Sequence, residues 1–331
     1  MDGEVRIGTC GWNYPAGRGS WNGIFYPPGA GRRFDELRYY AEHFDTVEVN
    51  STFYRLPRVE TTRSWAARTP AAFEFSVKLH QSFTHPAMAG RGPGTAGPRV
   101  SAAPDAPAPS DEPMTVPRVT ERDVDGFCES IDPLAQAGKL GALLVQFPPS
   151  FKLTPRSVAY LEWLLRAFAD YSPAVELRDR SWSDDLKTTL TLLNDARAAW
   201  VQIDEPKFRF SVRQNRLPNV THFYYMRLHG RNAARWWQHD EAEDRYDYLY
   251  SPEELKPFSE TVTAVRTLVR KAYLYLNNHF AAKSVADAVE LKHQLGQPVT
   301  GEYRGDMLVA YPFLRLIPGC RPEPALLPPA P

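Results

Sequence analysis

Short apolar runs with strand character alternate with stretches of helical period along almost the whole chain, and this alternation restricts the fold more than any other feature. It predicts a parallel sheet of α/β class, and eight units favour closure into a single (β/α)8 TIM-type barrel. The 331 residues suffice for one such barrel. The eight candidate strands are Val5–Gly8, Thr46–Asn50, Phe73–His80, Ala142–Phe147, Ala174–Arg178, Ala199–Asp204, His222–His229 and Lys271–Asn278.

Several of the intervening helices carry clear end signals. Thr154 and Pro155 supply a cap and a first-turn proline, and the run from Ser251 to Glu254 is a capping box. Ser183 precedes two aspartates that suit a helix N-terminus, and a helix from about Ala281 is expected to stop near Gly296. A doubly wound open sheet is the competing fold, but no G-x-G-x-x-G motif follows a strand.

Two segments stand apart by composition. Residues 87–118, after the third strand, are rich in Pro, Ala and Gly, and residues 316–331 form a Pro-rich tail. Such sequences bury too little apolar surface to offset chain entropy, so we expect a disordered insertion and a frayed tail. A lid or docking arm is the alternative interpretation of the insertion. The remainder of residues 1–315 is expected to form one barrel domain.

The charge balance excludes some classes of protein. Thirty-nine basic and 39 acidic side chains cancel, so bulk positive charge cannot drive nucleic-acid or membrane binding. The N-terminus has no secretory signal pattern, no stretch is apolar enough to span a membrane, and the three cysteines form no C-x-x-C pair. We therefore expect a cytoplasmic protein without membrane partners. The oligomeric state is left open.

Polar residues occupy one face of most candidate strands and lie near their C-terminal ends. Because side chains alternate with period two, Glu48 and Asn50 share one face of VEVN while the valines share the other. Helices must pack on the apolar face, so the polar face should point inward, where barrel enzymes build their sites. Burying so many charges is costly unless the interior is a functional pocket. The predicted set is Glu48, Asn50, Lys78, Gln146, Glu176, Arg178, Asp204, Arg227, His229, Asn277 and Asn278.

These residue types suggest acid–base chemistry on an anion. Glu48 and Glu176 could exchange protons across the pocket, with His229 as a third catalytic group. The cations of the set, Lys78 and two arginines, suit a bound phosphate or carboxylate. A Schiff base on Lys78 is disfavoured here, because a lysine among carboxylates usually stays charged.

A catalytic metal is the rival interpretation. Glu48, His80, Glu176, Asp204, His229 and His279 are ligand types near strand ends. However, the neighbouring arginines and lysine would compete with a cation, and no H-E-x-x-H or H-x-x-x-H spacing occurs, so a metal is not favoured. P-loop and G-x-S-x-G motifs are likewise absent, no G-x-G-x-x-G directly follows a candidate strand, and no nucleotide cofactor is indicated. Aromatic residues after the strands, including Trp12 and Trp182, could form a stacking wall for a ring.

The sequence resembles the YecE-like family, catalogued as domain of unknown function 72. The similar segments are IGTCGW at Ile7–Trp12, FYP at Phe25–Pro27, VEVNSTFYRLP at Val47–Pro57, FSVKLHQSFTHP at Phe75–Pro86, LLVQFPPSF at Leu143–Phe151, VELRDRSW at Val175–Trp182, MRLHGR at Met226–Arg231 and YLNNH at Tyr275–His279. The resemblance implies a TIM-type barrel and puts most of the predicted polar set at motif positions. Cys10 stands where relatives often carry serine. The family has been compared with divalent-metal apurinic endonucleases, but the histidine array of that site is not matched here.

We therefore expect an enzyme of hydrolase, lyase or isomerase type that acts on a small anionic substrate. One alternative is a phosphodiester-directed nucleic-acid enzyme, with or without a divalent metal. The other is a non-catalytic ligand-binding module.

Overall fold

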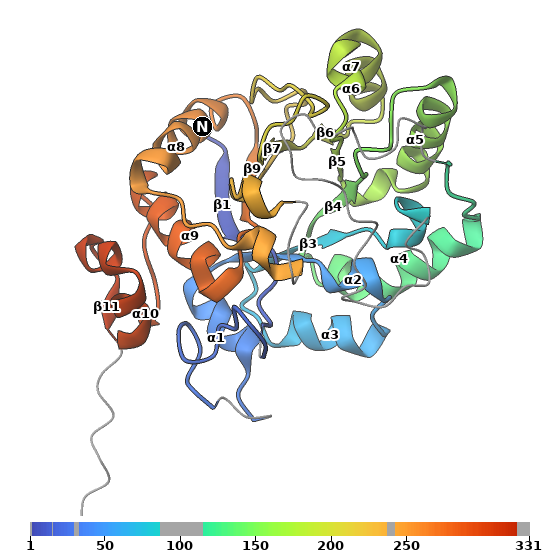
Figure 1. The fold of residues 1–331 in the computed structure, drawn as a ribbon. Helices are drawn as coiled ribbons and strands as arrows, with labels where there is room; N and C mark the ends of the chain where they lie inside the picture. The colour runs from blue at the N-terminus through green and yellow to red at the C-terminus, as the bar shows by residue number, and fades with distance from the viewer. Residues whose placement is uncertain (1, 15, 30–32, 87–114, 237–241, 323–331) are drawn as a thin grey trace, which may run out of the picture.

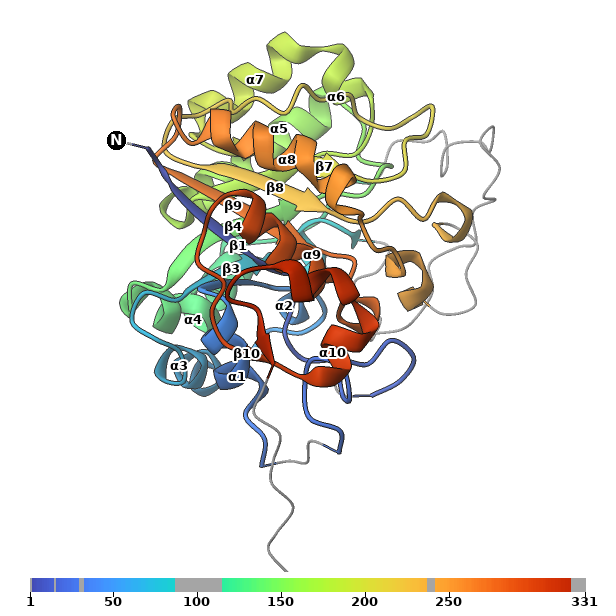
Figure 2. The same cartoon turned by 90° about the vertical axis from the view of Figure 1, so that its left-hand side faces the viewer.

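The computed structural model describes residues 2–14, 16–29, 33–86, 115–236 and 242–322. Nine of its strands form two parallel sheets, one in the order β2-β3-β4-β5-β6 and the other in the order β1-β9-β8-β7. Figure 2 shows the strands side by side and running in one direction. The strands are β1 Glu4–Thr9, β2 Thr46–Val49, β3 Glu74–Lys78, β4 Leu140–Gln146, β5 Pro173–Glu176, β6 Ala199–Trp200, β7 Gln202–Asp204, β8 Tyr224–Leu228 and β9 Lys271–Leu276.

The predicted α/β fold with parallel strands is confirmed, and each predicted strand has a counterpart. The sixth one, predicted over Ala199–Asp204, is divided at Val201 into β6 and β7, which belong to different sheets. At the other junction, β1 and β2 lie side by side without a ladder and are joined by a parallel bridge between Cys10 and Glu48. Because the ladders form two sheets rather than a closed ring, a single TIM-type barrel is not confirmed.

Helices surround the two sheets (Figure 1). Two helices begin at the predicted caps: Thr154 caps α5, and Ser251 forms the capping box of α8. The cap of α7 is Asp185 rather than Ser183. Gly296, with φ of +66°, follows α9. The helices are α1 Glu36–His43, α2 Ser51–Tyr54, α3 Val59–Ala67, α4 Glu121–Gln136, α5 Pro155–Ala167, α6 Ser181–Asp184, α7 Leu186–Asp195, α8 Pro252–Val265, α9 Lys283–Gln294 and α10 Gly305–Ala310.

Polar side chains connect the inner faces of the two sheets. The Tyr275 hydroxyl on β9 lies 2.6 Å from Thr46 Oγ1 on β2 and 2.9 Å from Ser76 Oγ on β3. Tyr225 on β8 donates to Glu48 on β2, at 2.8 Å. These groups are buried, and they form hydrogen bonds with one another. The hydrogen bonds compensate for the cost of removing the polar groups from water.

The two unusual segments are only partly described. Of the predicted insertion, residues 87–114 lie outside the described residues, as do residues 323–331 of the predicted tail. The beginning of that tail is packed rather than frayed: Ile317 and Cys320 are buried, and β11 (Arg321–Pro322) pairs with β10 (Glu302–Tyr303). In the described parts of the chain, every helix is too short or too polar to cross a bilayer.

Candidate functional site

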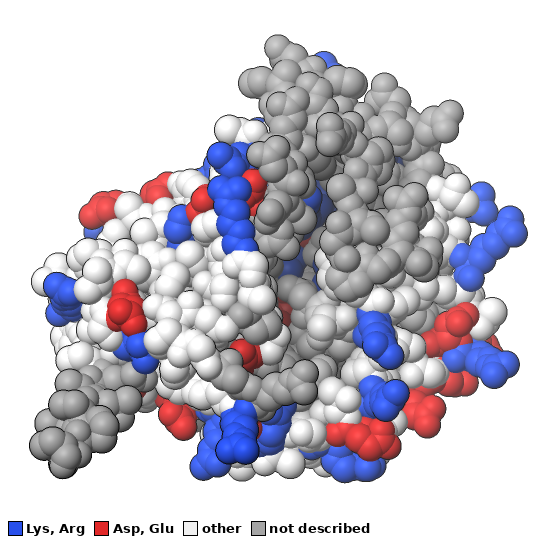
Figure 3. Space-filling view, turned by 60° about the horizontal axis from the view of Figure 1, so that its bottom comes forward, with Lys and Arg blue, Asp and Glu red and all other residues white. Residues whose placement is uncertain are grey.

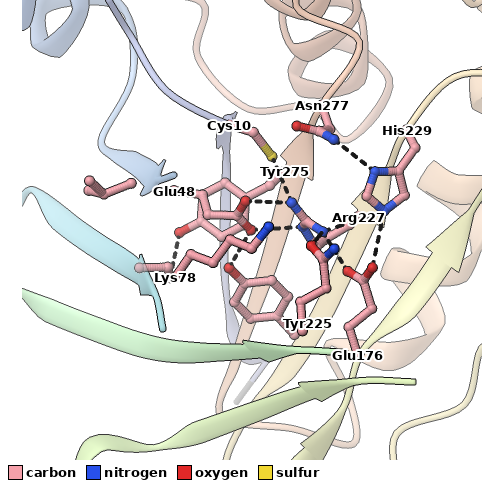
Figure 4. Close-up of polar contacts among 12 residues, drawn as sticks. Cys10, Glu48, Lys78, Glu176, Tyr225, Arg227, His229, Tyr275 and Asn277 are labelled. Atoms are coloured by element: carbon pink, nitrogen blue, oxygen red, sulfur yellow. Dashed lines mark hydrogen bonds and ion pairs between the residues drawn. The ribbon is translucent and has the colours of Figure 1, made fainter. Parts of the chain in front are cut away.

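Charged and amide side chains from both sheets meet at the carboxyl ends of the strands (Figure 4). Lys78, Gln146 and Glu176 are the last residues of β3, β4 and β5, while Glu48 lies in β2 and Arg227 in β8. Parallel pairing brings these ends to one face, and the registers place Gln146 beside Glu176. The period-two argument from sequence thus identified side chains that the structure brings into contact.

Arg227 is the centre of this cluster and is 1% exposed. Its Nε and Nη2 donate to the two carboxylate oxygens of Glu48, at 2.9 and 2.7 Å. Its Nη1 donates to Glu176 Oε2 at 2.5 Å and to Gln146 Oε1 at 2.9 Å. One buried guanidinium therefore neutralises charge on both carboxylates, and its Nη2 also lies 3.8 Å from the Cys10 thiol.

Glu176 has a second cationic partner in Arg178, whose Nε donates to Glu176 Oε1 at 2.7 Å. Burial alone would raise the pKa of Glu176, but Arg227 and Arg178 outweigh it and hold that pKa well below its usual range. Glu176 is therefore a permanent carboxylate near neutral pH. This favours a role in positioning the arginines over the proton-transfer role expected from sequence.

His229 lies just after β8 and is buried against the same groups. Asn277 Nδ2, just after β9, lies 2.8 Å from His229 Nδ1, and His229 Nε2 lies 3.4 Å from Arg178 Nη2 and 3.7 Å from Glu176 Oε1. Burial, together with Arg227, lowers the pKa of His229 to about 3. The imidazole is consequently neutral over the physiological range, and both its nitrogens are held in place.

Lys78 is the cation of the cluster that lacks a carboxylate partner. Among the residues that the structure describes, its ammonium forms no ion pair and donates no hydrogen bond; Nζ lies 4.1 Å from the centre of the Phe53 ring. Figure 4 shows the side chain extending from β3 toward Glu48 and Arg227. Burial and the charge of Arg227 lower the pKa of Lys78 to about 7.

The outer edge of the cluster is partly exposed. The Arg178 side chain is 15% exposed, and its Nη1 lies 3.6 Å from Glu205 Oε2, an oxygen without a hydrogen-bond donor in the described chain. Asn50, directly after β2, likewise has a buried Oδ1 that accepts no hydrogen bond from a described residue. Two buried acceptor oxygens, of Glu205 and Asn50, are thus without a hydrogen-bond donor among the described residues.

Two predicted residues belong to other networks. Asp204 accepts hydrogen bonds from Nε and Nη2 of Arg231, at 2.8 and 3.0 Å, and from the hydroxyl of Tyr250, at 2.8 Å. Asn278 donates to Asp287 at 2.6 Å. Since these partners come from the loops after β8 and from α9, both residues fasten those segments to the strands.

The two predicted ring-stacking residues pack in the hydrophobic core instead. Trp12 meets Trp65 edge to face, with ring centres 5.4 Å apart. Trp182 is fully buried, stacks on Phe151, and donates from Nε1 to the Phe151 carbonyl at 2.7 Å. A tryptophan after a strand is large enough to turn back onto the outer face, where helices cover it.

Three neighbours of the cluster were not predicted as site residues. Tyr225 follows the same alternation as Arg227 and could have been found by extending it two residues backward. Glu205 lies one residue past β7, where alternation no longer applies. His85, whose ring meets Phe53 at 4.9 Å, has a pKa held well below its usual value by burial and by Lys78 and Arg178.

The described residues do not group three histidine, cysteine or carboxylate side chains as a metal ion would need. Glu48 and Glu176 direct their oxygens at guanidinium groups instead.

Comparison with known proteins places this cluster in a family. The sequence profile described as "Protein of unknown function DUF72" matches residues 6–306, which include every residue of the cluster. The chain belongs to the DUF72 family. The YecE-like resemblance is thereby confirmed, since it names the same family.

Relatives of this DUF72 protein align with it over most of their length. The UPF0759 protein YunF of Bacillus subtilis (strain 168) is 27% identical over 312 residues, covering 91% of this chain and 96% of the relative. A DUF72 crystal structure from Thermotoga maritima MSB8 has 29% identity and a TM-score of 0.70, covering 89% of this chain and 100% of that one. One from Enterococcus faecalis V583 has 25% identity and a TM-score of 0.70, covering 88% and 95%.

Proposed function

We propose that this DUF72 protein is an enzyme that binds a small anionic substrate, bearing a phosphate or carboxylate, and exchanges a proton with it through Lys78. The observation that carries the proposal is the Lys78 ammonium, which has no ion-pair partner among the described residues, beside arginines whose carboxylate partners are already fixed. A lysine with a pKa near 7 can both accept and donate a proton at neutral pH, as general acid–base catalysis requires.

The remaining side chains have distinct parts in this proposal. Arg178, partly exposed, binds the anion by charge-assisted hydrogen bonds, and the Asn50 side-chain oxygen accepts a hydrogen bond from a hydroxyl or other donor of the substrate. Glu48 and Glu176 act as positioning residues that hold the guanidinium groups. Gln146, His229 and Asn277 complete the hydrogen bonds around Arg227 and Glu176; the first accepts from Arg227 and the other two are bonded to each other.

We further propose that the two sheets are halves of one TIM-type barrel within a single domain spanning residues 1–315. Support comes from the bridge between Cys10 and Glu48 and from the contact of Arg227 with carboxylates of the opposite sheet. A cytoplasmic location is also proposed, in keeping with the free thiols of Cys10, Cys128 and Cys320.

Nucleic-acid processing is a weaker candidate on surface charge. Figure 3 shows one face of the molecule. On its described surface, basic and acidic side chains are intermixed and form no extended basic region. Binding to a phosphate backbone requires many neutralising cations along a continuous track. A ligand small enough to contact Arg178 and Lys78 together fits the arrangement better.

Replacing Arg178 with glutamine is expected to weaken anion binding by about 10- to 150-fold, because a charge-assisted hydrogen bond contributes about 1.5–3 kcal/mol. Isothermal titration with inorganic phosphate, malonate and pyruvate at low ionic strength measures the affinity. The matched control is Arg180→Gln, two residues along, where the arginine pairs with Asp184 at the surface.

The control should bind the anions like the natural protein. Equal affinities for the natural protein and Arg178→Gln would contradict the assigned anion contact, and absence of binding to all three probes would overturn the proposed function. Tight binding with no product formed from any of a panel of small phosphates and carboxylic acids would make the protein the non-catalytic module.

A further inference from the structure

We infer that Lys78 is a covalent nucleophile that condenses with the carbonyl group of a small oxo acid to form an imine. This inference rests on the proposed function and deepens it, because it names the substrate class: an aldehyde or ketone with a carboxylate next to the reacting carbon. Sequence reasoning disfavoured such a role only because carboxylates were expected to pair with the lysine.

The contacts of the other inward lysines show how unusual Lys78 is. The Nζ of Lys139 donates to the carbonyls of Ala66 and Thr69, at 2.6 and 2.7 Å. Lys271 Nζ lies 2.6 Å from a Glu74 oxygen. A lysine that packs against the protein is normally satisfied in one of these ways, and among the described residues the half-buried side chain of Lys78 is not. Within the described chain, Lys78 has the Phe53 ring instead.

The charges that face Lys78 keep its amine available. Glu48 and Glu176 are committed to Arg227, and Glu176 also to Arg178, so neither approaches within ion-pair distance of Nζ. The two arginines repel a third positive charge, and His85 is neutral. The pKa of about 7 that results leaves a large share of Lys78 as the free amine at neutral pH, and the free amine is the nucleophile.

The proposed step is balanced without any further reactant. The Nζ lone pair attacks the carbonyl carbon, and the oxygen takes up a proton as the C–N bond forms, giving a carbinolamine. The nitrogen then loses one proton to solvent, and the hydroxyl group takes up a second proton and leaves as water while the nitrogen lone pair forms the C=N bond; loss of the remaining N–H proton gives the neutral imine. Amine and carbonyl thus give imine and water, and protonation of the imine makes it an electron sink for deprotonating the neighbouring carbon.

The surroundings of Lys78 suit a carboxylate adjacent to that carbonyl. Arg178 presents a partly exposed guanidinium two residues past the end of β5, which is the next strand but one from β3 in the sheet. A charge held there would bring the carbonyl of a short oxo acid to the amine. The buried Phe53 ring lies against the amine, with its centre 4.1 Å from Nζ.

Trapping by reduction tests the inference. The full-length protein is incubated with pyruvate or glyoxylate and sodium cyanoborohydride at pH 7, and the reduced adduct is located by peptide mass mapping. Hydride delivered to the imine carbon converts C=N into a stable secondary amine. We expect Lys78 to be modified about 10-fold or more faster than any other lysine, because an ordinary lysine with a pKa near 10.4 is almost wholly protonated.

Two variants and one parallel measurement make the outcome decisive. Lys78→Arg should abolish the selective adduct, and Lys139→Arg should retain it. Pyruvate binding is measured by titration on the same samples. Binding without a Lys78 adduct would overturn the imine while leaving the anion site intact; an adduct spread evenly over many lysines would also overturn it. Neither binding nor an adduct would overturn both this inference and the proposed function.

Discussion

Replacing Arg227 with methionine is expected to lower the free energy of unfolding by about 3–5 kcal/mol at pH 7, the cost of breaking a buried ion pair from one side. The guanidinium is 1% exposed and bonds to both oxygens of Glu48 and to Glu176. Methionine fills similar volume but leaves two carboxylates buried with fewer donors. Urea denaturation of the variant measures the loss.

A matched surface variant separates this effect from the general cost of losing an arginine. Arg180→Met removes an exposed ion pair with Asp184 and should cost less than about 1 kcal/mol. The deficit of Arg227→Met should also shrink as the pH falls from 8 to 5. Burial of Glu176 without that cation raises its pKa in the variant, so the folded state binds protons more readily than the unfolded chain. A deficit of the same size for both arginines would contradict the buried network.

Replacing Lys78 with methionine should have the opposite sign and stabilise the protein by about 2–4 kcal/mol at pH 7 or below, as judged from the shift of its pKa with allowance for partial exposure. The folded protein holds the pKa of Lys78 at about 7, whereas the unfolded chain binds that proton up to its ordinary value. Protonation therefore opposes folding fully below pH 7. The penalty decreases as pH rises and disappears near pH 10.5.

The pH dependence distinguishes this effect from a simple gain of apolar contact. Urea denaturation of Lys78→Met and the natural protein at pH 6.5, 8 and 9.5 should give a difference that falls steadily with pH. Lys187→Met, at an exposed position of α7, should change stability by less than about 0.5 kcal/mol at each pH. Destabilisation by Lys78→Met, or a gain that does not vary with pH, would mean that Lys78 has a stabilising partner after all.

The sequence predicted those parts of the site that depend on strand periodicity. Alternation puts Glu48, Glu176 and Arg227 on inward faces, and parallel pairing puts Lys78 and Gln146 at the same ends. Neither result needs any knowledge of distant contacts. The strand positions were predictable for the same reason, because a buried strand between amphipathic helices is marked by its own residues.

What could not be predicted depends on which side chains meet across the two sheets. Periodicity gives the face but not the partner, so Asp204 was grouped with the cluster although Arg231 and Tyr250 bind it. Likewise, sequence could not show that Arg227 would occupy both carboxylates and leave Lys78 unpaired. The division of the sixth strand depends on pairing geometry at Val201, which no local pattern records.

The most direct test of whether the Lys78 amine is largely unprotonated at neutral pH is its own titration. Trace acetylation with acetic anhydride at a series of pH values between 5 and 11, followed by mass spectrometry of the peptide that contains Lys78, gives the pKa of that one amine. We predict a midpoint near pH 7, about three units below the pKa of an ordinary lysine. A midpoint near 10.5, the value of an ordinary lysine, would contradict both the proton-transfer and the covalent role of Lys78.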